Sequence, residues 1–268
     1  MTDAKRPLGL LVSIVAVAVM IFLILPQVIL LIQSFTAEDY LSFPPKAYGL
    51  RWYGFIFQDD TWRKALGTSL IVAGVVTPLA LLFGTAAALG LDRGPLITRK
   101  ALRTLLVSPM VLPHVVLGMA IYRVFLPLRF DDTLMGFIAA HLVLCIPYVI
   151  VTVGASLQAF DRSLEQAAAS LGAPLPVALW RVTLPIIRPG LIGGAVFAFI
   201  TSFDEFIVTY FLASRMTTAP IQIFSSLSYQ LEPSIAAVSG LTLVVTAALS
   251  GLLILRGGVA GKGGGFAA

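Results

Sequence analysis

Hydrophobic residues along this chain are gathered into long runs, and polar residues fall mostly between those runs. Six runs approach the roughly 20 apolar residues that an α-helix needs to cross a bilayer. They cover residues 8–32, 65–91, 105–125, 134–153, 190–212 and 235–255. The pattern predicts an all-α polytopic membrane protein of about six transmembrane helices, forming a single domain over residues 1–268.

Five prolines fall inside these runs, at Pro26, Pro78, Pro109, Pro113 and Pro147. In a membrane, neighbouring helices can satisfy the carbonyl groups that a proline leaves without a donor. We therefore expect kinks at these positions and not helix breaks.

The first run follows Lys5 and Arg6, which gives it some likeness to a secretory signal. It is longer than the roughly 7–15 apolar residues of a signal peptide, and no small-residue cleavage site follows it. We expect a retained helix.

Composition supports a membrane location, because the chain is 58% hydrophobic and 12% charged, with a mean hydropathy of +0.96. Soluble domains average about 25% charged residues. The single cysteine, Cys145, excludes a disulfide within the chain. The net charge of +5 is not arranged as a basic stripe with aromatic residues, so we expect no nucleic-acid partner.

The distribution of cations predicts the orientation. An even number of spans places both termini on one side, and eleven of the eighteen lysines and arginines then share that side. Under the positive-inside rule this side is the cytoplasm. Residues 33–64 are then an external loop, and residues 154–189 are a cytoplasmic loop.

The external loop is rich in aromatic residues, among them Tyr40, Phe43, Trp52, Tyr53 and Trp62. Such a content suits a segment that docks a partner protein. It equally suits an aromatic belt at the level of the lipid headgroups, and the sequence leaves both interpretations open.

The cytoplasmic loop has the signals of two short helices. Ser163 and Gln166 have the spacing of a capping box, which predicts a helix start. Gly172 can adopt the left-handed conformation that ends a helix, and Pro174 suits the first turn of a second helix. A helix, a sharp turn and another helix are therefore expected.

Pro185 and Pro189 are expected to separate this unit from the fifth span. The result is a compact knob that a soluble partner could grip. An amphipathic hairpin lying on the headgroups is the alternative.

The same loop resembles the EAA loop of permease subunits of ATP-binding-cassette importers. Their pattern is Glu-Ala-Ala, three residues, Gly, nine residues, an aliphatic residue, any residue and Leu-Pro. The matching residues, with the spacing intact, are Ala167, Ala168, Gly172, Val182, Leu184 and Pro185. Gln166 stands where the family has glutamate, and Glu165 precedes it.

The resemblance implies that this coupling loop, residues 154–189, contacts an ATPase subunit. The expected contact residues are Glu165, Gln166, Ala167, Ala168, Gly172, Val182, Leu184 and Pro185. It also implies an ATPase dimer, a second and similar permease, and an extracytoplasmic substrate-binding protein as partners, in the bacterial cytoplasmic (inner) membrane.

This chain is expected to be no enzyme and to bind no cofactor, with ATP and Mg²⁺ held by the partner ATPase. The segment nearest to a phosphate loop, Gly257–Lys262, has Arg256 at the position of the first glycine and Gly263 at that of the Ser/Thr.

The resemblance extends over most of the chain and points to the permease group for polyamines and related amines. It rests on Ser202-Phe203-Asp204-Glu205-Phe206, on residues 220–223 and on residues 233–237. Neighbouring groups carry iron, oxyanions, thiamine, phosphonates or opines on one scaffold, so the substrate stays open.

Asp204 and Glu205 are the acidic residues well inside a predicted span. Carboxylates are costly there and usually face a pathway or a partner charge. They are candidates for a cationic substrate pathway, or for a structural pair with Arg123 or with a partner subunit. An ion-coupled secondary transporter using these carboxylates is the alternative function.

His114 and His141 fall in the third and fourth spans. An isolated histidine on an apolar helix is usually a hydrogen-bonded packing residue, and no Cys or carboxylate stands at ligand spacing beside either one. We therefore propose neither a metal site nor catalytic residues.

Overall fold

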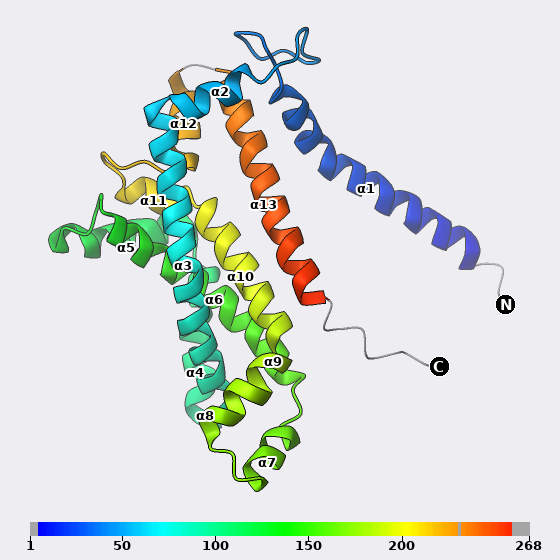
Figure 1. Ribbon diagram of the computed structural model, residues 1–268, viewed down its shortest axis with the longest axis vertical. Coiled ribbons are helices and arrows are strands. Elements are labelled where there is room, and N and C mark those ends of the chain that lie inside the picture. Colours follow the sequence, from blue (N-terminus) through cyan, green and yellow to red (C-terminus); the bar gives the residue numbers. More distant parts are fainter. Residues whose placement is uncertain (1–4, 230–231, 259–268) are drawn as a thin grey trace. The chain divides into compact units, whose positions relative to one another are not determined.

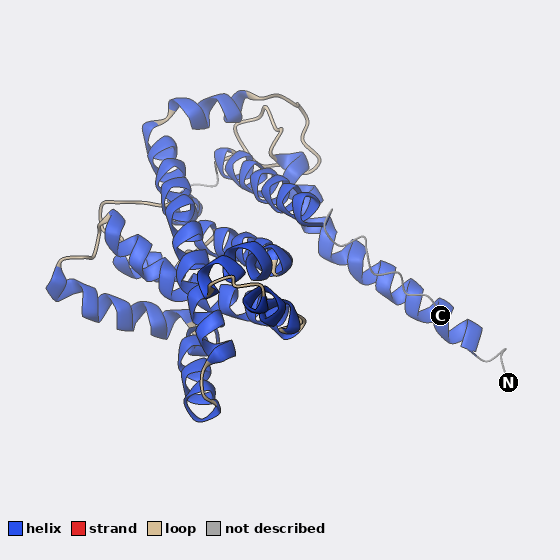
Figure 2. Ribbon diagram, turned by 60° about the horizontal axis from the view of Figure 1, so that its bottom comes forward, coloured by secondary structure: helices blue, strands red, loops and turns tan. Residues whose placement is uncertain are grey.

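The protein is described by a computed structural model over residues 5–229 and 232–258, and every regular element in these ranges is a helix (Figure 1, Figure 2). In chain order the elements are α1 (Lys5–Gln33), α2 (Arg51–Gln58), α3 (Asp60–Arg93), α4 (Leu96–Val107), the 3-10 turn η1 (Ser108–Met110), α5 (His114–Leu128), α6 (Leu134–Gln158), α7 (Ser163–Ser170), α8 (Leu175–Ala178), the π-helical turn η2 (Leu179–Thr183), α9 (Leu184–Ile186), α10 (Arg188–Phe203), α11 (Ile207–Leu212), α12 (Ala219–Tyr229) and α13 (Ser234–Gly258). Most of the segment compared with a phosphate loop, 257–262, lies outside the described residues.

Over the described residues, four helices are long and apolar enough to cross a membrane: α1, α3, α6 and α13. They coincide with four of the six predicted runs. Two bent helix pairs raise the number to six if each pair is one span. The third run falls on the first pair, and the fifth run shares only residues 190–203 with the second pair. Residues 98–110 and 114–128 meet at 100°, and residues 175–186 and 188–203 meet at 72°.

The prolines act differently from one run to the next. Pro26, Pro78 and Pro147 lie inside α1, α3 and α6, as predicted. The expectation of a mere kink is wrong at Pro109 and Pro113, where the helix breaks between η1 and α5. Pro113 is the N-cap of α5, a position at which its missing N–H leaves no gap in the helix ladder.

The chain divides into two compact units. One comprises the chain up to Arg63 together with residues 223–245, and the other comprises residues 64–222 together with the chain from Thr246. In the first unit, residues of the aromatic-rich predicted external loop contact one another. Trp52 and Trp62 are buried, and Trp52 Nε1 donates to the Glu38 carbonyl oxygen at 2.9 Å. The segment is shorter than predicted because α3 begins at Asp60.

The second unit is built around α6, along which α10 lies (Figure 1). Its core joins buried side chains of α3, α5, α6, α10 and α11. The small residues of α3 permit close packing: a Cβ on Gly84 would stand 2.6 Å from Val149 Cβ. Contacts at this distance exclude any larger residue unless the two helices separate.

A carboxylate fixes the loop between α5 and α6 to the segment after α11. Asp132 Oδ1 accepts backbone N–H groups of Ser214, Arg215 and Met216 at 2.8–2.9 Å. Burial raises the pKa of the Asp132 carboxyl, but the three N–H donors together outweigh it and hold the pKa below its ordinary value.

Candidate functional site

The coupling loop contains the expected helix, turn and helix. α7 ends at Ser170, Gly172 has a φ of 82°, and α8 begins at Leu175. The turn closes with two hydrogen bonds, from Gly172 N–H to the Ala169 oxygen at 2.9 Å and from Ala173 N–H to the Ala168 oxygen at 3.0 Å. This pairing is the Schellman motif, which needs a left-handed residue at the glycine position.

Details of the loop differ from the predictions. The predicted capping box is wrong: the N-cap residue is Arg162 with no side-chain cap, and Asp161 Oδ1 accepts the Ser163 N–H at 2.9 Å. This bond, which lies outside the apolar segments, lowers the pKa of Asp161 below its ordinary value. Pro174 is the N-cap of α8 and does not lie in its first turn.

The two prolines at the end of the loop flank the bend that separates it from α10, as expected. Pro185 lies inside the short helix α9, and Pro189 lies in the first turn of α10. The helical direction changes between them, at Ile187. Residues 175–186 are continuously helical, so Pro185 lies in the last turn of that run, whereas Pro189 lies in the first turn of α10, where a proline is tolerated.

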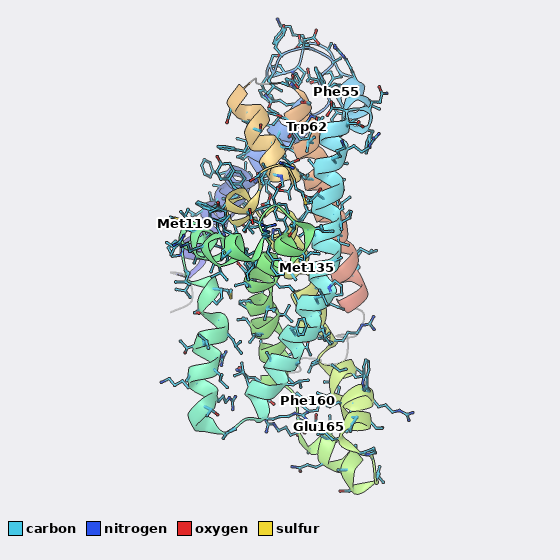
Figure 3. All side chains as sticks on the ribbon, turned by 90° about the vertical axis from the view of Figure 1, so that its left-hand side faces the viewer. Phe55, Trp62, Met119, Met135, Phe160 and Glu165 are labelled. Atoms are coloured by element: carbon cyan, nitrogen blue, oxygen red, sulfur yellow. The ribbon has the colours of Figure 1, made fainter. Side chains whose placement is uncertain are left out.

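Glu165 and Gln166, adjacent in sequence, have different surroundings. Glu165 Oε1 accepts a hydrogen bond from Arg93 Nη2 at 2.7 Å and another from the Thr183 hydroxyl, and 18% of its side chain is exposed. Figure 3 shows Glu165 beside Phe160, at the end of the molecule where α7 and α8 lie. Gln166 is exposed.

A second charged pair joins the same two parts of the chain. Arg162 Nη2 donates to Asp92 Oδ2 at 2.7 Å and to the Asp92 carbonyl oxygen at 2.9 Å. Together with Leu157, Phe160 and the pair from Arg93 to Glu165, these residues line a cavity of about 110 Å³. Sequence reasoning missed both pairs. The sequence contains a signal for both pairs. Asp92 and Arg93 are adjacent at the end of α3, and Arg162 and Glu165 have opposite charges three residues apart on the loop.

Three large apolar side chains of the loop are more than half exposed. The exposed fraction is 89% for Leu171, 74% for Trp180 and 57% for Leu175. The residues that match the EAA pattern differ in exposure. Ala167 and Pro185 are exposed, while Ala168, Val182 and Leu184 are half-buried. Exposed apolar clusters of this kind mark interaction surfaces.

Asp204 and Glu205 do not lie within a continuous helix, as the sequence suggested. α10 ends at Phe203 and α11 begins at Ile207, so both carboxylates occupy a break. Hydropathy alone did not show the break, because apolar residues continue on both sides of it. Asp204 is exposed, whereas Glu205 is buried.

Glu205 is bonded inside the unit. Its Oε1 accepts the Val208 N–H at 2.8 Å, which caps the start of α11, and its Oε2 lies 3.5 Å from His114 Nδ1. Among the described residues, no ion pair joins either carboxylate to Arg123. The side chain opposite Glu205 is thus a histidine at the start of α5, which spacing along the chain did not reveal.

His141 is a packing residue, as predicted. It is 1% exposed, and its two ring nitrogens lie 2.9 Å from Ser202 Oγ and 2.8 Å from Thr209 Oγ1. These bonds tie α6 to α10 and α11 on both sides of the break. Over the part of the chain that the structure describes, no group of three or more His, Cys, Asp or Glu side chains is placed to hold a metal ion.

Several apolar helices long enough to cross a membrane, with a folded loop between two of them, define a polytopic membrane protein. Residues 77–256 match the family described as binding-protein-dependent transport system inner membrane component, and the chain belongs to that family. It is a permease subunit of an ATP-binding-cassette importer. Nothing in these similarities supports the ion-coupled alternative.

Relatives in sequence carry names from polyamine transport. The putrescine transport system permease protein PotI of Escherichia coli (strain K12) is 33% identical over 231 residues, which cover 83% of this chain and 82% of that protein. The spermidine/putrescine transport system permease protein PotC of Haemophilus influenzae is 28% identical, over 85% of this chain and 89% of that protein.

Solved structures share the fold. A permease chain of a bacterial transporter that imports the acidic polysaccharide alginate superposes with a TM-score of 0.70 at 14% identity, covering 96% of this chain and 98% of that chain. A chain of an amino acid transporter crystallised with histidines superposes with a TM-score of 0.56 at 20% identity, covering 77% and 95%. Importers of chemically different substrates thus share this architecture.

Proposed function

We propose that this permease imports a polyamine or a related small cationic amine, as one of two similar subunits that line the pathway. The observation that carries the proposal is Asp204, an exposed carboxylate at a helix break within an apolar segment. Facing lipid, a carboxylate costs about 2.5–3.5 kcal/mol on translocon scales. Facing a cation, it replaces part of the hydration that the cation loses. The relatives named for putrescine and spermidine support this class of substrate.

The two carboxylates then have separate roles. Asp204 contacts the substrate, because its carboxylate is exposed. Glu205 holds the break in place, because its oxygens are engaged by the Val208 N–H and by His114. Both were candidates for the pathway, and burial is what separates them.

The coupling loop is the proposed contact with the ATPase. Its exposed apolar residues Leu171, Leu175 and Trp180 suit a groove on a partner, and the Schellman turn at Gly172 fixes the angle between α7 and α8. The other proposed contacts are Gln166, Ala167, Ala168, Val182, Leu184 and Pro185. ATP and Mg²⁺ bind to that ATPase, and this chain binds no cofactor of its own.

The proposed setting is the bacterial inner membrane with both termini in the cytoplasm. Eleven of eighteen lysines and arginines on the cytoplasmic side support this orientation. A binding protein delivers substrate from the other side. A solved alginate importer that shares the fold, with a TM-score of 0.72, was crystallised with a substrate-bound periplasmic protein.

The test uses the complex that copurifies with the tagged chain, reconstituted into proteoliposomes with its binding protein and labelled putrescine. We expect Asp204→Asn to raise the half-saturating concentration by about tenfold, the usual effect of losing one charge-assisted contact, at normal complex yield. Glu205→Gln should lower yield and thermal stability instead. Asp131→Asn, which removes a carboxylate from the loop before α6, is the matched control.

Two results would overturn the proposal. Asp204→Asn could transport putrescine with wild-type kinetics, which would remove the carboxylate from the pathway. Wild-type complex could carry molybdate and not putrescine, in line with a Haloferax volcanii relative named as a probable molybdenum ABC transporter permease protein, 32% identical over 60% of this chain.

A further inference from the structure

The coupling loop is attached to three membrane helices by two different means. Chain connectivity links it to α6 at its start and to α10 at its end. α3 has no such link, since Arg93 and Glu165 are 72 residues apart in sequence. Among the described residues, the polar bonds between the loop and the end of α3 are those from Arg93 to Glu165 and from Arg162 to Asp92.

The pair at Glu165 differs from the pair at Asp92 in how far its cation is exposed and in a third partner. The exposed side-chain fractions are 30% for Arg93 and 18% for Glu165, against 56% for Arg162 and 16% for Asp92. Water and salt screen exposed pairs, so such pairs contribute little. Glu165 also accepts the Thr183 hydroxyl, and Thr183 is fully buried in η2. One carboxylate oxygen therefore joins α7, η2 and α3.

The inward direction of the Glu165 side chain also determines which residue of the loop faces a partner protein. The family pattern has its glutamate at position 166, where this chain has an exposed glutamine. The carboxylate of Glu165 is turned towards Arg93 and Thr183, and its Oε1 accepts a hydrogen bond from each of them. Glu165 consequently does not replace the missing glutamate on the outer surface.

We propose that Glu165, Arg93 and Thr183 form an internal clamp that passes movement of the coupling loop to α3, while the neutral Gln166 faces the ATPase. The inference rests on the proposed function of the loop. Breaking the clamp leaves the contact surface with the ATPase intact and disconnects α3 from the coupling loop. ATP hydrolysis then continues with less transport for each ATP consumed.

The test measures putrescine uptake and ATP hydrolysis in the same proteoliposomes. We expect Glu165→Gln and Arg93→Gln each to lower uptake per ATP by about fivefold, the lower end of common coupling between sites, with the ATPase still copurifying. The charge exchange Arg93→Glu with Glu165→Arg should recover most of the loss. Asp161→Asn is the matched control, because it removes a carboxylate four residues away and asparagine also caps helices well.

Unchanged uptake per ATP in Glu165→Gln would overturn the clamp. So would an Arg93→Gln variant with normal coupling beside a defective Glu165→Gln, because the carboxylate would then serve the ATPase directly. Loss of the copurifying ATPase in Glu165→Gln would also show that the carboxylate serves the ATPase directly. If wild-type complex does not take up putrescine, the proposed substrate is wrong, and stimulation of ATP hydrolysis by the binding protein replaces uptake as the measure of coupling.

Discussion

Replacing Gly172 by valine tests the turn of the coupling loop. The residue has a φ of 82°, and a Cβ built on it meets no heavy atom within 4 Å. The space is therefore open, and a steric clash contributes nothing. What remains is the cost of the left-handed backbone, about 1–2 kcal/mol for an L-residue and more for a β-branched one.

The structure thus predicts a graded series. Asparagine visits the left-handed region readily and is found at this helix position, so Gly172→Asn should behave almost as wild type. Gly172→Ala should cost about 1 kcal/mol and Gly172→Val about 2 kcal/mol or more. Such energies change the population of the correct turn by a factor of about 5–30.

The assay is copurification of the ATPase with each tagged variant, together with uptake by the reconstituted complex. ATPase recovery and uptake should fall in the order Gly, Asn, Ala, Val, while membrane insertion of the chain stays constant. Equal defects in Gly172→Asn and Gly172→Val would refute the reasoning, since side-chain bulk and not backbone strain would then be responsible. Wild-type behaviour of Gly172→Val would remove the loop from coupling.

Two further predictions concern orientation and acid stability. With Cys145 replaced by serine, a cysteine at Asp60 should react with an impermeant thiol reagent from outside and one at Gln166 only after the membrane is opened; reversed labelling would overturn the orientation. Asp132→Asn should lower the thermal stability of the detergent-purified chain near neutral pH. Because the folded-state pKa of Asp132 is lowered, the stabilisation is present above the unfolded-state pKa and is lost as the pH falls through the folded-state value, so the difference between variant and wild type should disappear in acid. A difference that persists in acid would show that the charge of Asp132 is not its cause.

Hydropathy predicted the long helices because membrane helices satisfy their own backbone and need only apolar side chains. It could not predict the breaks after Met110 and Phe203. Apolar residues continue on both sides of each break, so average hydropathy stays high across Pro109 and Pro113 in the first and across Asp204 and Glu205 in the second. For this reason the expected kink in the third span and the expected continuous helix in the fifth span were wrong.

The candidate site was predictable where function depends on backbone geometry and unpredictable where it depends on side-chain direction. Gly172 was identified because few residues other than glycine adopt its φ. Adjacent residues point about 100° apart around a helix, so Glu165 and Gln166 face opposite environments. Which of them faces inward follows from the positions of Arg93 and Thr183, which only the folded chain supplies.

The length of α3 has a mechanical consequence. Its 34 residues at 1.5 Å each make a rod of about 51 Å, whereas the hydrocarbon core is about 30 Å thick. Upright in a bilayer, the rod therefore extends beyond the lipid tails, and Arg93 stands at one of its ends. The clamp at that end can work in water, at a distance from the acyl chains. Changes in bilayer thickness or lipid composition should then alter how the helices tilt while leaving the hydrogen bonds of the clamp unchanged.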